Sequence, residues 1–494
     1  MKLRDLLRAA PVNAIHGNEG VEVTAVTADS RLVTPGALFV AIPGMRADGA
    51  QYAESAAAKG AVAIVAEKRL DLPATIVETS DAREALAVIA ANFNGRAADA
   101  LSIIGVTGTS GKTTTTKMIE AIFDATGEPA GLVGTIEYRA GDERLSADRT
   151  TPDAVVLHEW FAKMRAAGVR RAVMEVSSHA LALKRTFGIR FAAAVFTNLS
   201  RDHFDFHGSF EEYFAAKRIL FDQIDPSKKC AIVNIDDPYG RRLAAALPAA
   251  AVTFGRSDEA DIRPEDGFSA DVRGLHGTVR TPWGAVTVAS PLIGVPNLYN
   301  FLGAIGAALA VGLPVAAVEA GIRSLETVRG RFERIASDGG PTVIVDYAHK
   351  PDALEKLLHA VRDLAPRRRI VLLFGCGGDR DKGKRPEMAA IASRLADFTI
   401  LTSDNPRSEA PESILDDIER GMTTKNYERI ADRRAAIERA ISRADVDDVI
   451  VIAGKGHESY QVVGDQVVHF DDREEAELAL KKRSEKAIPK KVEN

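Results

Sequence analysis

The sequence has little cysteine, no excess of basic residues and no long apolar run. Its two cysteines, Cys230 and Cys376, cannot build a disulfide framework, which favours a reducing compartment. The formal net charge of −5 disfavours a nucleic-acid partner, because proteins that bind phosphate backbones usually carry a basic excess. There is no signal-peptide pattern and no run of about eighteen apolar residues, so we expect a cytoplasmic protein without membrane insertion.

Apolar runs alternate with helical patterns along most of the chain. With 494 residues the chain is too long for one ordinary core. Runs such as LSIIGVT, RRAVMEV, TVIVDYA and DDVIVIAGKG are typical of parallel strands buried on both faces. The polar break NGRAADA and the segment VRGRFERI separate three such regions. We therefore predict the α/β fold class with three domains, residues 1–95, 96–330 and 331–494.

The stretch GVTGTSGKTTTTK, residues 105–117, has the composition of a phosphate-binding loop. It follows the apolar run LSIIGVT and precedes the helical pattern MIEAIFDAT, which is the context such a loop needs. Glycines let backbone N–H groups close on phosphate oxygens, Lys112 supplies positive charge, and the Thr113 hydroxyl can ligate magnesium. Val106 stands where the usual pattern has its first glycine. The alternative is a chance Gly-Lys-Thr in a turn.

A lysine interrupts an apolar helical stripe in YFAAKRILFDQI. Tyr213, Lys217, Leu220 and Ile224 fall on one face of the predicted helix. Lys217 can bury its stem and hold its ammonium in water, which periodicity alone favours. Alternatively, burial lowers the pKa of the lysine and leaves a neutral amine, which carbon dioxide can convert to a carbamate.

Four further side chains allow two interpretations each. Glu175 ends the run RRAVMEV, either as an exposed strand end or at the carboxyl edge where open α/β sheets bind ligands. His203 is either an ordinary polar histidine or a metal ligand. Arg407, in SDNPRSEAP, belongs either to a solvated turn or to a clamp for a carboxylate or phosphate. Cys376 is either a nucleophile or a passive loop thiol, and because no histidine motif lies beside it we expect the passive thiol.

Ten motifs in order resemble the Mur ligases, the ATP-dependent amide-forming enzymes of peptidoglycan synthesis. They span nearly the whole chain: TADSRLVTPGALFVAIPG, TGTSGKTTT, MEVSSHAL, FTNLSRDHFDFHG, YFAAKRILF, VRGRFERI, DYAHKPDAL, FGCGGDRDKGKRP, DNPRSE and AGKGHE. The resemblance implies a central phosphate-loop ATPase domain with a parallel sheet and a C-terminal Rossmann-like domain. The related folylpolyglutamate synthases share the phosphate loop.

The motifs are most similar to those of the family members that add the third amino acid to UDP-N-acetylmuramoyl-L-alanyl-D-glutamate. The DNPR pattern is similar to members that add meso-diaminopimelate. The implied reaction uses ATP as co-substrate and Mg²⁺ as cofactor: the D-glutamate γ-carboxylate attacks the γ-phosphate, and the amine then displaces phosphate from an acyl phosphate. We expect a monomer. The resemblance also implies that the N-terminal domain, residues 1–95, binds the UDP-sugar. Alternatives are an L-lysine-adding homologue, a folylpolyglutamate synthase, which should lack this N-terminal domain and DNPR, or a non-catalytic phosphate-loop switch protein.

The resemblance also implies the site residues. The ATP set is Gly108, Thr109, Ser110, Gly111, Lys112, Thr113, Thr114, Asn300, Arg331 and Asp346. The UDP-muramoyl dipeptide set is Ser30, Met45, Arg46, Ala47, Thr150, Thr151, Ser177 and Arg185, with Leu183 where a glutamine is usual. The meso-diaminopimelate set is Arg380, Asp404, Asn405, Pro406, Arg407, Gly454 and Glu458. The magnesium set is Thr113, Glu175, His203 and Lys217, with Lys217 as N6-carboxylysine.

Overall fold

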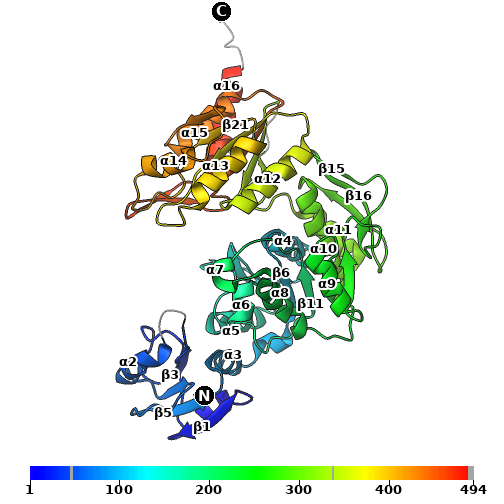
Figure 1. Ribbon diagram of the computed structural model, residues 1–494. Coiled ribbons are helices and arrows are strands. Elements are labelled where there is room, and N and C mark those ends of the chain that lie inside the picture. The colour runs from blue at the N-terminus through cyan, green and yellow to red at the C-terminus, as the bar shows by residue number, and fades with distance from the viewer. Residues whose placement is uncertain (45–47, 336–338, 488–494) are drawn as a thin grey trace, which may run out of the picture. The chain divides into compact units, whose positions relative to one another are not determined.

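The computed structural model describes residues 1–44, 48–335 and 339–487 (Figure 1). The chain divides into two compact units. The first contains Met1–Pro264, Val279–Val286 and Tyr299–Gly321, and the second contains Glu265–Thr278, Thr287–Leu298 and Ile322–Asn494. The predicted α/β class is confirmed, and the three domain boundaries given above stay predictions. Within the described ranges, no helix has the length and apolar character needed to cross a membrane.

The N-terminal sheet of the first unit has the order β1-β5-β4-β3-β2. Its strands are β1 (Val12–His16), β2 (Ala25–Thr27), β3 (Ala37–Val40), β4 (Ala63–Ala66) and β5 (Thr75–Thr79). All neighbours are parallel except β1 and β5. Its helices are α1 (Leu3–Leu6), η1 (Gly49–Tyr52), α2 (Ala53–Ala58) and α3 (Ala82–Phe93). One apolar cluster includes residues of α1 and α3 and another includes residues of α2, so the sheet is buried on both faces.

The larger sheet of the first unit has the order β13-β12-β11-β6-β10-β7-β8-β9. Its strands are β6 (Ser102–Thr107), β7 (Ala130–Val133), β8 (Glu137–Ala140), β9 (Glu143–Ser146), β10 (Arg171–Glu175), β11 (Ala193–Phe196), β12 (Ala231–Asn234) and β13 (Ala251–Phe254). The strands are parallel from β13 to β7, and β8 and β9 add an antiparallel edge. The carboxyl ends of β6, β10 and β11 therefore meet at one edge of the sheet.

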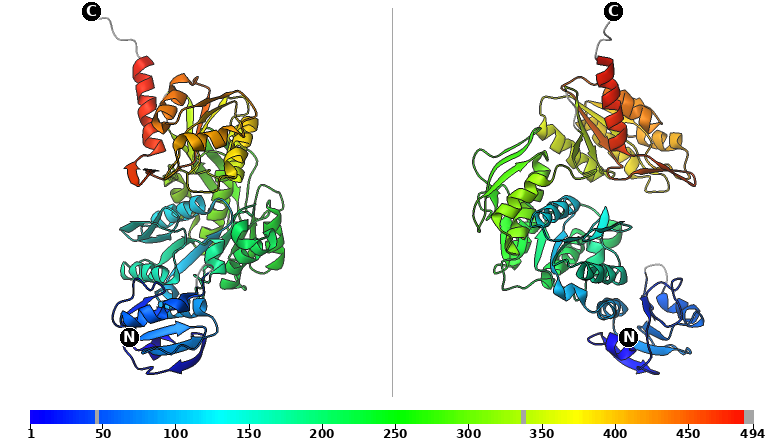
Figure 2. Two further views of the ribbon diagram at one scale, coloured as in Figure 1. Left: turned by 60° about the vertical axis from the view of Figure 1, so that its left-hand side comes forward. Right: turned by 180° about the vertical axis from the view of Figure 1, so that it is seen from behind.

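Helices and short 3-10 turns surround this sheet (Figure 2). They are η2 (Ala97–Ala100), α4 (Lys112–Asp124), α5 (Ala154–Ala166), α6 (Ser178–Ala182), α7 (Phe204–His207), α8 (Phe210–Arg218), η3 (Ile219–Gln223), α9 (Pro238–Ala246), α10 (Val295–Ala310) and α11 (Val315–Ser324). A small antiparallel sheet consists of β14 (Arg263–Pro264), β15 (Ser269–Asp271), β16 (Gly274–Arg280) and β17 (Val286–Ser290).

The C-terminal sheet of the second unit has the order β18-β19-β23-β20-β21-β22. Its strands are β18 (Glu333–Ile335), β19 (Thr342–Asp346), β20 (Ile370–Phe374), β21 (Phe398–Leu401), β22 (Tyr427–Arg429) and β23 (Val449–Ala453), and only β18 is antiparallel. A separate hairpin joins β24 (Tyr460–Val463) to β25 (Gln466–His469).

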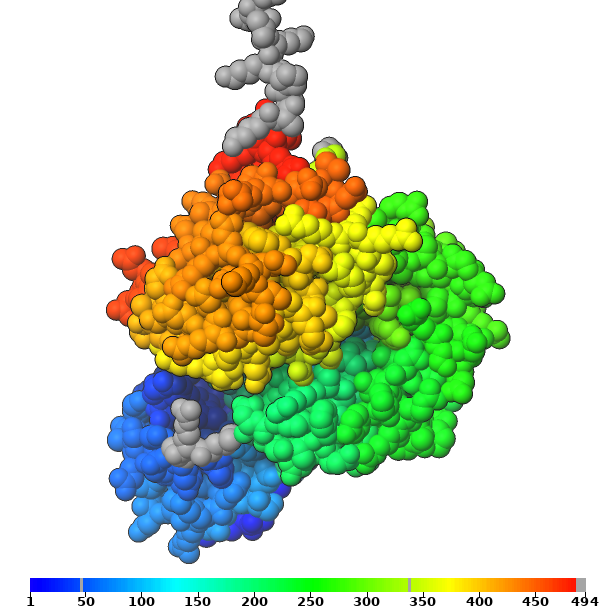
Figure 3. Space-filling model, turned by 45° about the horizontal axis from the view of Figure 1, so that its top comes forward, coloured from blue at the N-terminus to red at the C-terminus, as the bar shows by residue number. Residues whose placement is uncertain are grey.

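Helices cover both faces of the C-terminal sheet. Side chains of α12 (Pro351–Leu364), α13 (Lys384–Leu395) and α14 (Pro411–Glu419) pack in one cluster with Ile344. Those of α15 (Arg433–Arg443) and α16 (Asp472–Ala487) pack in another with Val343 and Val345. Successive residues of β19 thus point to opposite buried faces, as expected of an α/β sheet. Figure 3 shows one face of this part of the chain in yellow and orange.

Candidate active site

The phosphate loop connects β6 to α4, and at two of its positions only glycine fits. Gly108 has φ +146° and Gly111 has φ +88°. A Cβ on Gly108 would lie 1.8 Å from Thr197 Oγ1, and one on Gly111 would lie 2.5 Å from Asn300 Oδ1. Because α4 begins at Lys112, its first N–H groups and the positive end of its dipole lie at this loop, which suits the loop to an anion.

The Lys112 ammonium folds back over the loop. Its Nζ donates to the carbonyl oxygens of Gly108 at 2.9 Å and Thr109 at 3.0 Å. Asn300, from α10, accepts a hydrogen bond from Thr115 Oγ1 at 3.4 Å and so lies beside the start of α4. The structure therefore brings together the predicted loop, its lysine and Asn300.

Glu175 is buried at the end of β10 and is not an exposed strand end. Its carboxylate accepts hydrogen bonds from Thr113 Oγ1 at 3.0 Å, from Thr135 N at 2.7 Å and from Thr135 Oγ1 at 3.0 Å. Only 1% of the residue is exposed. The parallel register that pairs Glu175 with Val106 explains why this carboxylate meets the residue that follows the phosphate-loop lysine. Thr135 has no signal in the sequence, since its position depends on β7 pairing with β10.

Lys217 does not extend to water. The residue is 1% exposed, and its Nζ donates to Gly108 O at 2.7 Å and lies 4.4 Å from the ring centroid of Tyr213. Burial, followed by repulsion from Lys112, holds the pKa of Lys217 well below its ordinary value. Tyr213, Leu220 and Ile224 are buried too, so the predicted apolar stripe is present. The structure therefore selects the buried, readily neutralised amine.

His203 lies at the rim of this region, in the turn before α7. It has φ +55°, and its Nε2 is 3.4 Å from Asp202 Oδ2. Its ring centroid is 4.7 Å from that of His179 and 6.2 Å from that of Tyr213. Burial lowers the pKa of His179. No three His, Cys, Asp or Glu side chains form a metal-binding group among the residues the structure describes.

Four residues predicted to bind the muramoyl dipeptide form a network at the end of β10. Thr151 Oγ1 donates to Glu175 O at 2.8 Å and accepts from Ser177 N at 3.1 Å. Arg185 Nη1 donates to Thr151 O at 2.7 Å, and Thr150 Oγ1 is 3.0 Å from Thr135 Oγ1, which also contacts Glu175.

The predicted dipeptide set also includes Ser30, the loop Met45-Arg46-Ala47, and Leu183 at the position where a glutamine is usual. Ser30 belongs to the N-terminal sheet region, where its carbonyl accepts from Lys59 Nζ at 2.8 Å. Leu183 follows the last turn of α6. Met45, Arg46 and Ala47 lie outside the described residues.

In the second unit, the DNPR loop contacts the turn that follows β23. Arg407 has φ +52°, and its Nη1 donates to Gly378 O at 2.9 Å and Asn405 O at 3.4 Å. Asn405 Nδ2 donates to Glu458 Oε2 at 2.9 Å. Gly454 has φ +119°, and a Cβ there would lie 2.8 Å from Asp404 Oδ2. Pro406 lies within the same loop, so the structure brings six of the predicted residues together: Asp404, Asn405, Pro406, Arg407, Gly454 and Glu458.

Arg380 extends from the glycine-rich loop after β20 and is exposed. A Cβ on Gly377 would lie 3.7 Å from Arg380 Cγ and 2.9 Å from Arg407 Nη1, so both arginines flank Gly377. The loop contains Cys376, whose pKa burial raises to about 12. This thiol therefore stays protonated, as expected of a passive cysteine.

Arg331 and Asp346 lie together beside β18 and β19. Asp346 accepts from Phe332 N at 2.7 Å and Ala348 N at 2.8 Å, and burial raises the pKa of this carboxyl. The Arg331 guanidinium lies 4.8 Å from the ring centroid of Tyr347.

Three buried cations around the DNPR loop were not predicted from the sequence. Arg385 binds Glu409 and Asp417, Arg433 binds Asp472, and Lys455 binds Asn405. Arg385, Glu409 and Lys455 lie inside motifs quoted above. Their position in these motifs was the only feature of the sequence that could have marked them as part of this region.

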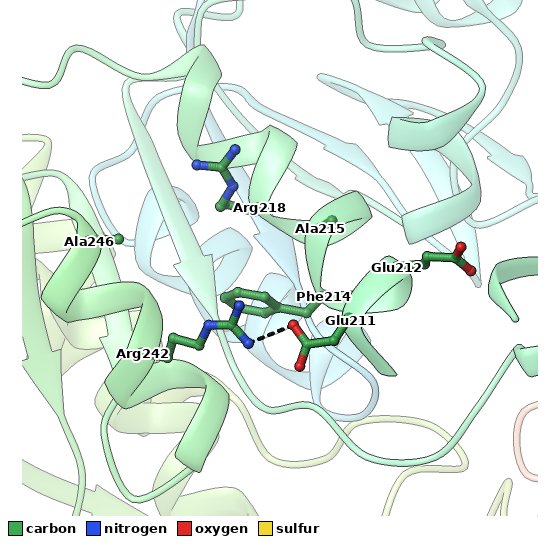
Figure 4. Close-up of a pocket in the computed structure, with 7 residues that line it drawn as sticks. All are labelled: Glu211, Glu212, Phe214, Ala215, Arg218, Arg242 and Ala246. Atoms are coloured by element: carbon green, nitrogen blue, oxygen red, sulfur yellow. Dashed lines mark hydrogen bonds and ion pairs between the residues drawn. The ribbon is translucent and has the colours of Figure 1, made fainter. Parts of the chain in front are cut away.

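A separate surface pocket of ≈530 Å³ lies between α8 and α9 (Figure 4). Glu211 and Arg242 form an ion pair there at 2.6 Å, and the Arg242 guanidinium lies 5.0 Å from the Phe214 ring centroid. Lys217 shares α8 but does not line this pocket.

Three family models match the chain in order. They are the Mur ligase family, catalytic domain (residues 22–96), the Mur ligase middle domain (residues 106–308) and the Mur ligase, glutamate ligase domain (residues 330–456). A UDP-N-acetylmuramoyl-L-alanyl-D-glutamate--2,6-diaminopimelate ligase from Geobacillus kaustophilus is 44% identical over 98% of this chain and 100% of its own length. One of the same name from Thermosynechococcus vestitus is 46% identical over 98% of each chain.

Solved structures of Mur ligases and of related enzymes are also similar to this chain. A UDP-N-acetylmuramoyl-L-alanyl-D-glutamate--2,6-diaminopimelate ligase structure matches with a TM-score of 0.71 and 32% identity over 98% of this chain and 99% of its own. A folylpolyglutamate synthase from Mycobacterium tuberculosis, complexed with ADP and AMPPCP, shares the fold with a TM-score of 0.57 and 20% identity, and covers 74% of this chain and 91% of its own. With relatives above 40% identity along nearly its full length, the chain belongs to the Mur ligase family.

Proposed function

We propose that the chain is an ADP-forming ligase that joins meso-diaminopimelate to the D-glutamate γ-carboxylate of UDP-N-acetylmuramoyl-L-alanyl-D-glutamate, with ATP as co-substrate, in the cytoplasm. The observation that carries the proposal is the match to relatives of this name over 98% of the chain. The buried DNPR loop with Arg407 supports the choice of amino acid, because a guanidinium fits the extra carboxylate that distinguishes diaminopimelate from lysine.

The γ-phosphate of ATP is the proposed point of attack. The acceptor γ-carboxylate displaces ADP to give an acyl phosphate, and the amine then displaces inorganic phosphate and loses a proton as the amide forms. Residues 108–114 bind the phosphates through backbone N–H groups, and Lys112 neutralises their charge by exchanging its carbonyl contacts for phosphate oxygens. Asn300, Arg331 and Asp346 complete the proposed ATP-binding set.

Magnesium fits the end of β10, because Thr113 Oγ1 and the Glu175 carboxylate are hard oxygen donors 3.0 Å apart. Bound there, Mg²⁺ would neutralise phosphate charge. We propose that Thr113, Glu175, His203 and Lys217 hold it. An ammonium cannot ligate a cation, so this role requires that the neutral Lys217 amine add to carbon dioxide and lose a proton, which gives N6-carboxylysine. The burial of Lys217 favours the neutral amine that this step needs.

The remaining binding roles follow the two networks. Thr150, Thr151, Ser177 and Arg185, together with Ser30, Met45, Arg46 and Ala47, are proposed to bind the UDP-muramoyl dipeptide. Arg380, Asp404, Asn405, Pro406, Arg407, Gly454 and Glu458 are proposed to bind meso-diaminopimelate. We propose that the protein acts as a monomer without a nucleic-acid partner.

Phosphate release from ATP by the purified protein tests this function. Release should require both UDP-N-acetylmuramoyl-L-alanyl-D-glutamate and meso-diaminopimelate, and L-lysine should replace the diamino acid poorly. The product should have the mass of the tripeptide. Release that needs no acceptor would instead indicate a phosphate-loop switch protein, and release with a folate acceptor and glutamate would indicate a folylpolyglutamate synthase.

A further inference from the structure

Lys455 lies in a turn whose backbone is tightly constrained. The flanking residues Gly454 and Gly456 have φ +119° and +52°. A Cβ on Gly456 would lie 2.6 Å from Tyr347 Cβ, so no larger residue fits there without movement. Glu458 N donates to Lys455 O at 3.0 Å and closes the turn. The lysine side chain therefore starts from a fixed point beside the DNPR loop.

The Lys455 ammonium is fully buried and bonds to two residues of the proposed amino-acid site. Its Nζ donates to Asn405 Oδ1 at 3.1 Å and lies 3.5 Å from Glu458 Oε2. The same Oδ1 accepts from Val462 N at 3.0 Å. With donors on Oδ1, the Asn405 amide has one favourable orientation, in which Nδ2 donates to Glu458 at 2.9 Å.

The charge of Lys455 acts on the Glu458 carboxyl. Burial lowers the pKa of Lys455 itself, and the carboxylates of Asp404 and Glu458 oppose this shift and favour the ammonium. Burial raises the pKa of Glu458, and Lys455 opposes this rise most strongly among its charged neighbours. The negative charge of Asp404 also raises the pKa of Glu458, and the hydrogen bond from Asn405 lowers it. Other charged or titratable groups around this cluster, within the described residues, include Arg407, Arg433, Asp472, Tyr347, Tyr460, His349 and Cys376.

We propose that Lys455 is a positioning residue for the amino-acid substrate, which orients Asn405 and keeps Glu458 as the carboxylate that receives the distal ammonium of a diamino acid. This inference rests on the proposed function. Lys455 is 0% exposed, so it acts through Asn405 and Glu458 and does not touch the substrate. Both contacts of Glu458 use Oε2, so an ammonium can bind through Oε1 without displacing either one.

The experiment compares full-length wild type, Lys455→Met, Lys455→Gln, Glu458→Gln and the double variant Lys455→Met/Glu458→Gln. The KM values for meso-diaminopimelate and ATP are measured by phosphate release at about pH 6.5 and about pH 9. Removing the lysine charge raises the pKa of Glu458 further, so a larger fraction of the carboxyl is protonated at the lower pH and cannot pair with the ammonium. The KM for diaminopimelate in Lys455→Met should therefore rise about tenfold more at the lower pH than at the higher.

Three comparisons isolate the charge from packing. The KM for ATP should stay within about twofold of wild type in every variant. Lys455→Gln can still donate to Asn405, so it should recover affinity at high pH and keep the added loss at low pH. Wild type should itself show a small rise in the KM for diaminopimelate at the lower pH, because burial raises the pKa of Glu458. Glu458→Gln should abolish this rise, and the double variant should show no more pH dependence than Glu458→Gln.

Each failure has a distinct meaning. An inactive wild type would refute the proposed function. If wild type is active but the KM for diaminopimelate of either Lys455 variant depends on pH as that of wild type does, the role of Lys455 is overturned. If both Lys455 variants fail to fold, Glu458→Gln decides alone: an acidic rise in KM as large as that of wild type would show that Glu458 is not the group on which Lys455 acts.

Discussion

Replacing Arg407 by alanine should remove the preference for diaminopimelate while leaving the protein folded. The guanidinium uses Nη1 for the carbonyl oxygens of Gly378 and Asn405, which leaves the Nε and Nη2 edge to pair with a carboxylate. Arg407 has φ +52°, and alanine carries the same Cβ, so the substitution changes the side-chain contacts without adding backbone strain.

The expected magnitude follows from the two hydrogen bonds lost. Hydrogen bonds to charged groups contribute about 1.5–3 kcal/mol each, and the lower value is appropriate for a side chain that is half-buried. Two bonds then give about 3 kcal/mol, and each 1.4 kcal/mol is about a factor of ten. We expect kcat/KM for meso-diaminopimelate to fall by about a hundredfold or more in Arg407→Ala.

The assay is phosphate release with meso-diaminopimelate or L-lysine as the amine, for wild type, Arg407→Ala and Arg407→Lys. The lysine variant keeps the charge and loses the planar pair, so it should recover little. For L-lysine as substrate, Arg407→Ala should change kcat/KM by less than about threefold, because no distal carboxylate is present. Equal loss with both amines, or an unaffected alanine variant, would refute the clamp.

Other perturbations test the remaining sites. Lys112→Ala should abolish phosphate release while circular dichroism stays unchanged, because its ammonium donates to the Gly108 and Thr109 carbonyls of the loop; release by a folded variant would contradict the phosphate-loop assignment. Lys217→Arg should inactivate although it keeps a positive charge, and added short carboxylic acids should partly restore Lys217→Ala; near-normal activity of the arginine variant would exclude the carboxylysine. Asp472→Ala should destabilise the C-terminal unit by about 3–5 kcal/mol in denaturant unfolding, because it leaves the fully buried Arg433 without its carboxylate. The exposed Glu412→Gln, in the same unit, serves as the control and should change stability by less than about 1 kcal/mol.

The parallel strands were predictable because burial on both faces leaves a continuous apolar run. Val343, Ile344 and Val345 show this directly, since neighbours in sequence enter different clusters. The antiparallel edge of β8 and β9 was not predicted. Its residues are largely charged, and ion pairs such as Lys117–Glu137 and Arg139–Glu120 contribute to it, so no apolar period marks it.

The helical periodicity predicted that Lys217 lies on an apolar stripe, but it did not predict whether its ammonium is buried or in water. The deciding contact is with Gly108 O, 109 positions away in the chain, and it exists only because α8 packs against the phosphate loop. The same holds for Arg407. Its loop was recognisable from its turn residues, while the left-handed backbone and the Gly378 carbonyl that orient the guanidinium depend on tertiary contacts.

The two thiols offer a way to follow how each unit opens. Cys230 belongs to the first unit and Cys376 to the second, and both are buried free cysteines. Burial raises the pKa of both thiols. In the folded chain at neutral pH, alkylating reagents therefore cannot reach either sulfur, and neither sulfur is present as the reactive thiolate. Labelling at Cys230 then reports local unfolding of the first unit, and labelling at Cys376 that of the second. Mass spectrometry of the two peptides would measure both opening free energies in one sample, and nucleotide or substrate would slow the labelling of whichever unit it stabilises.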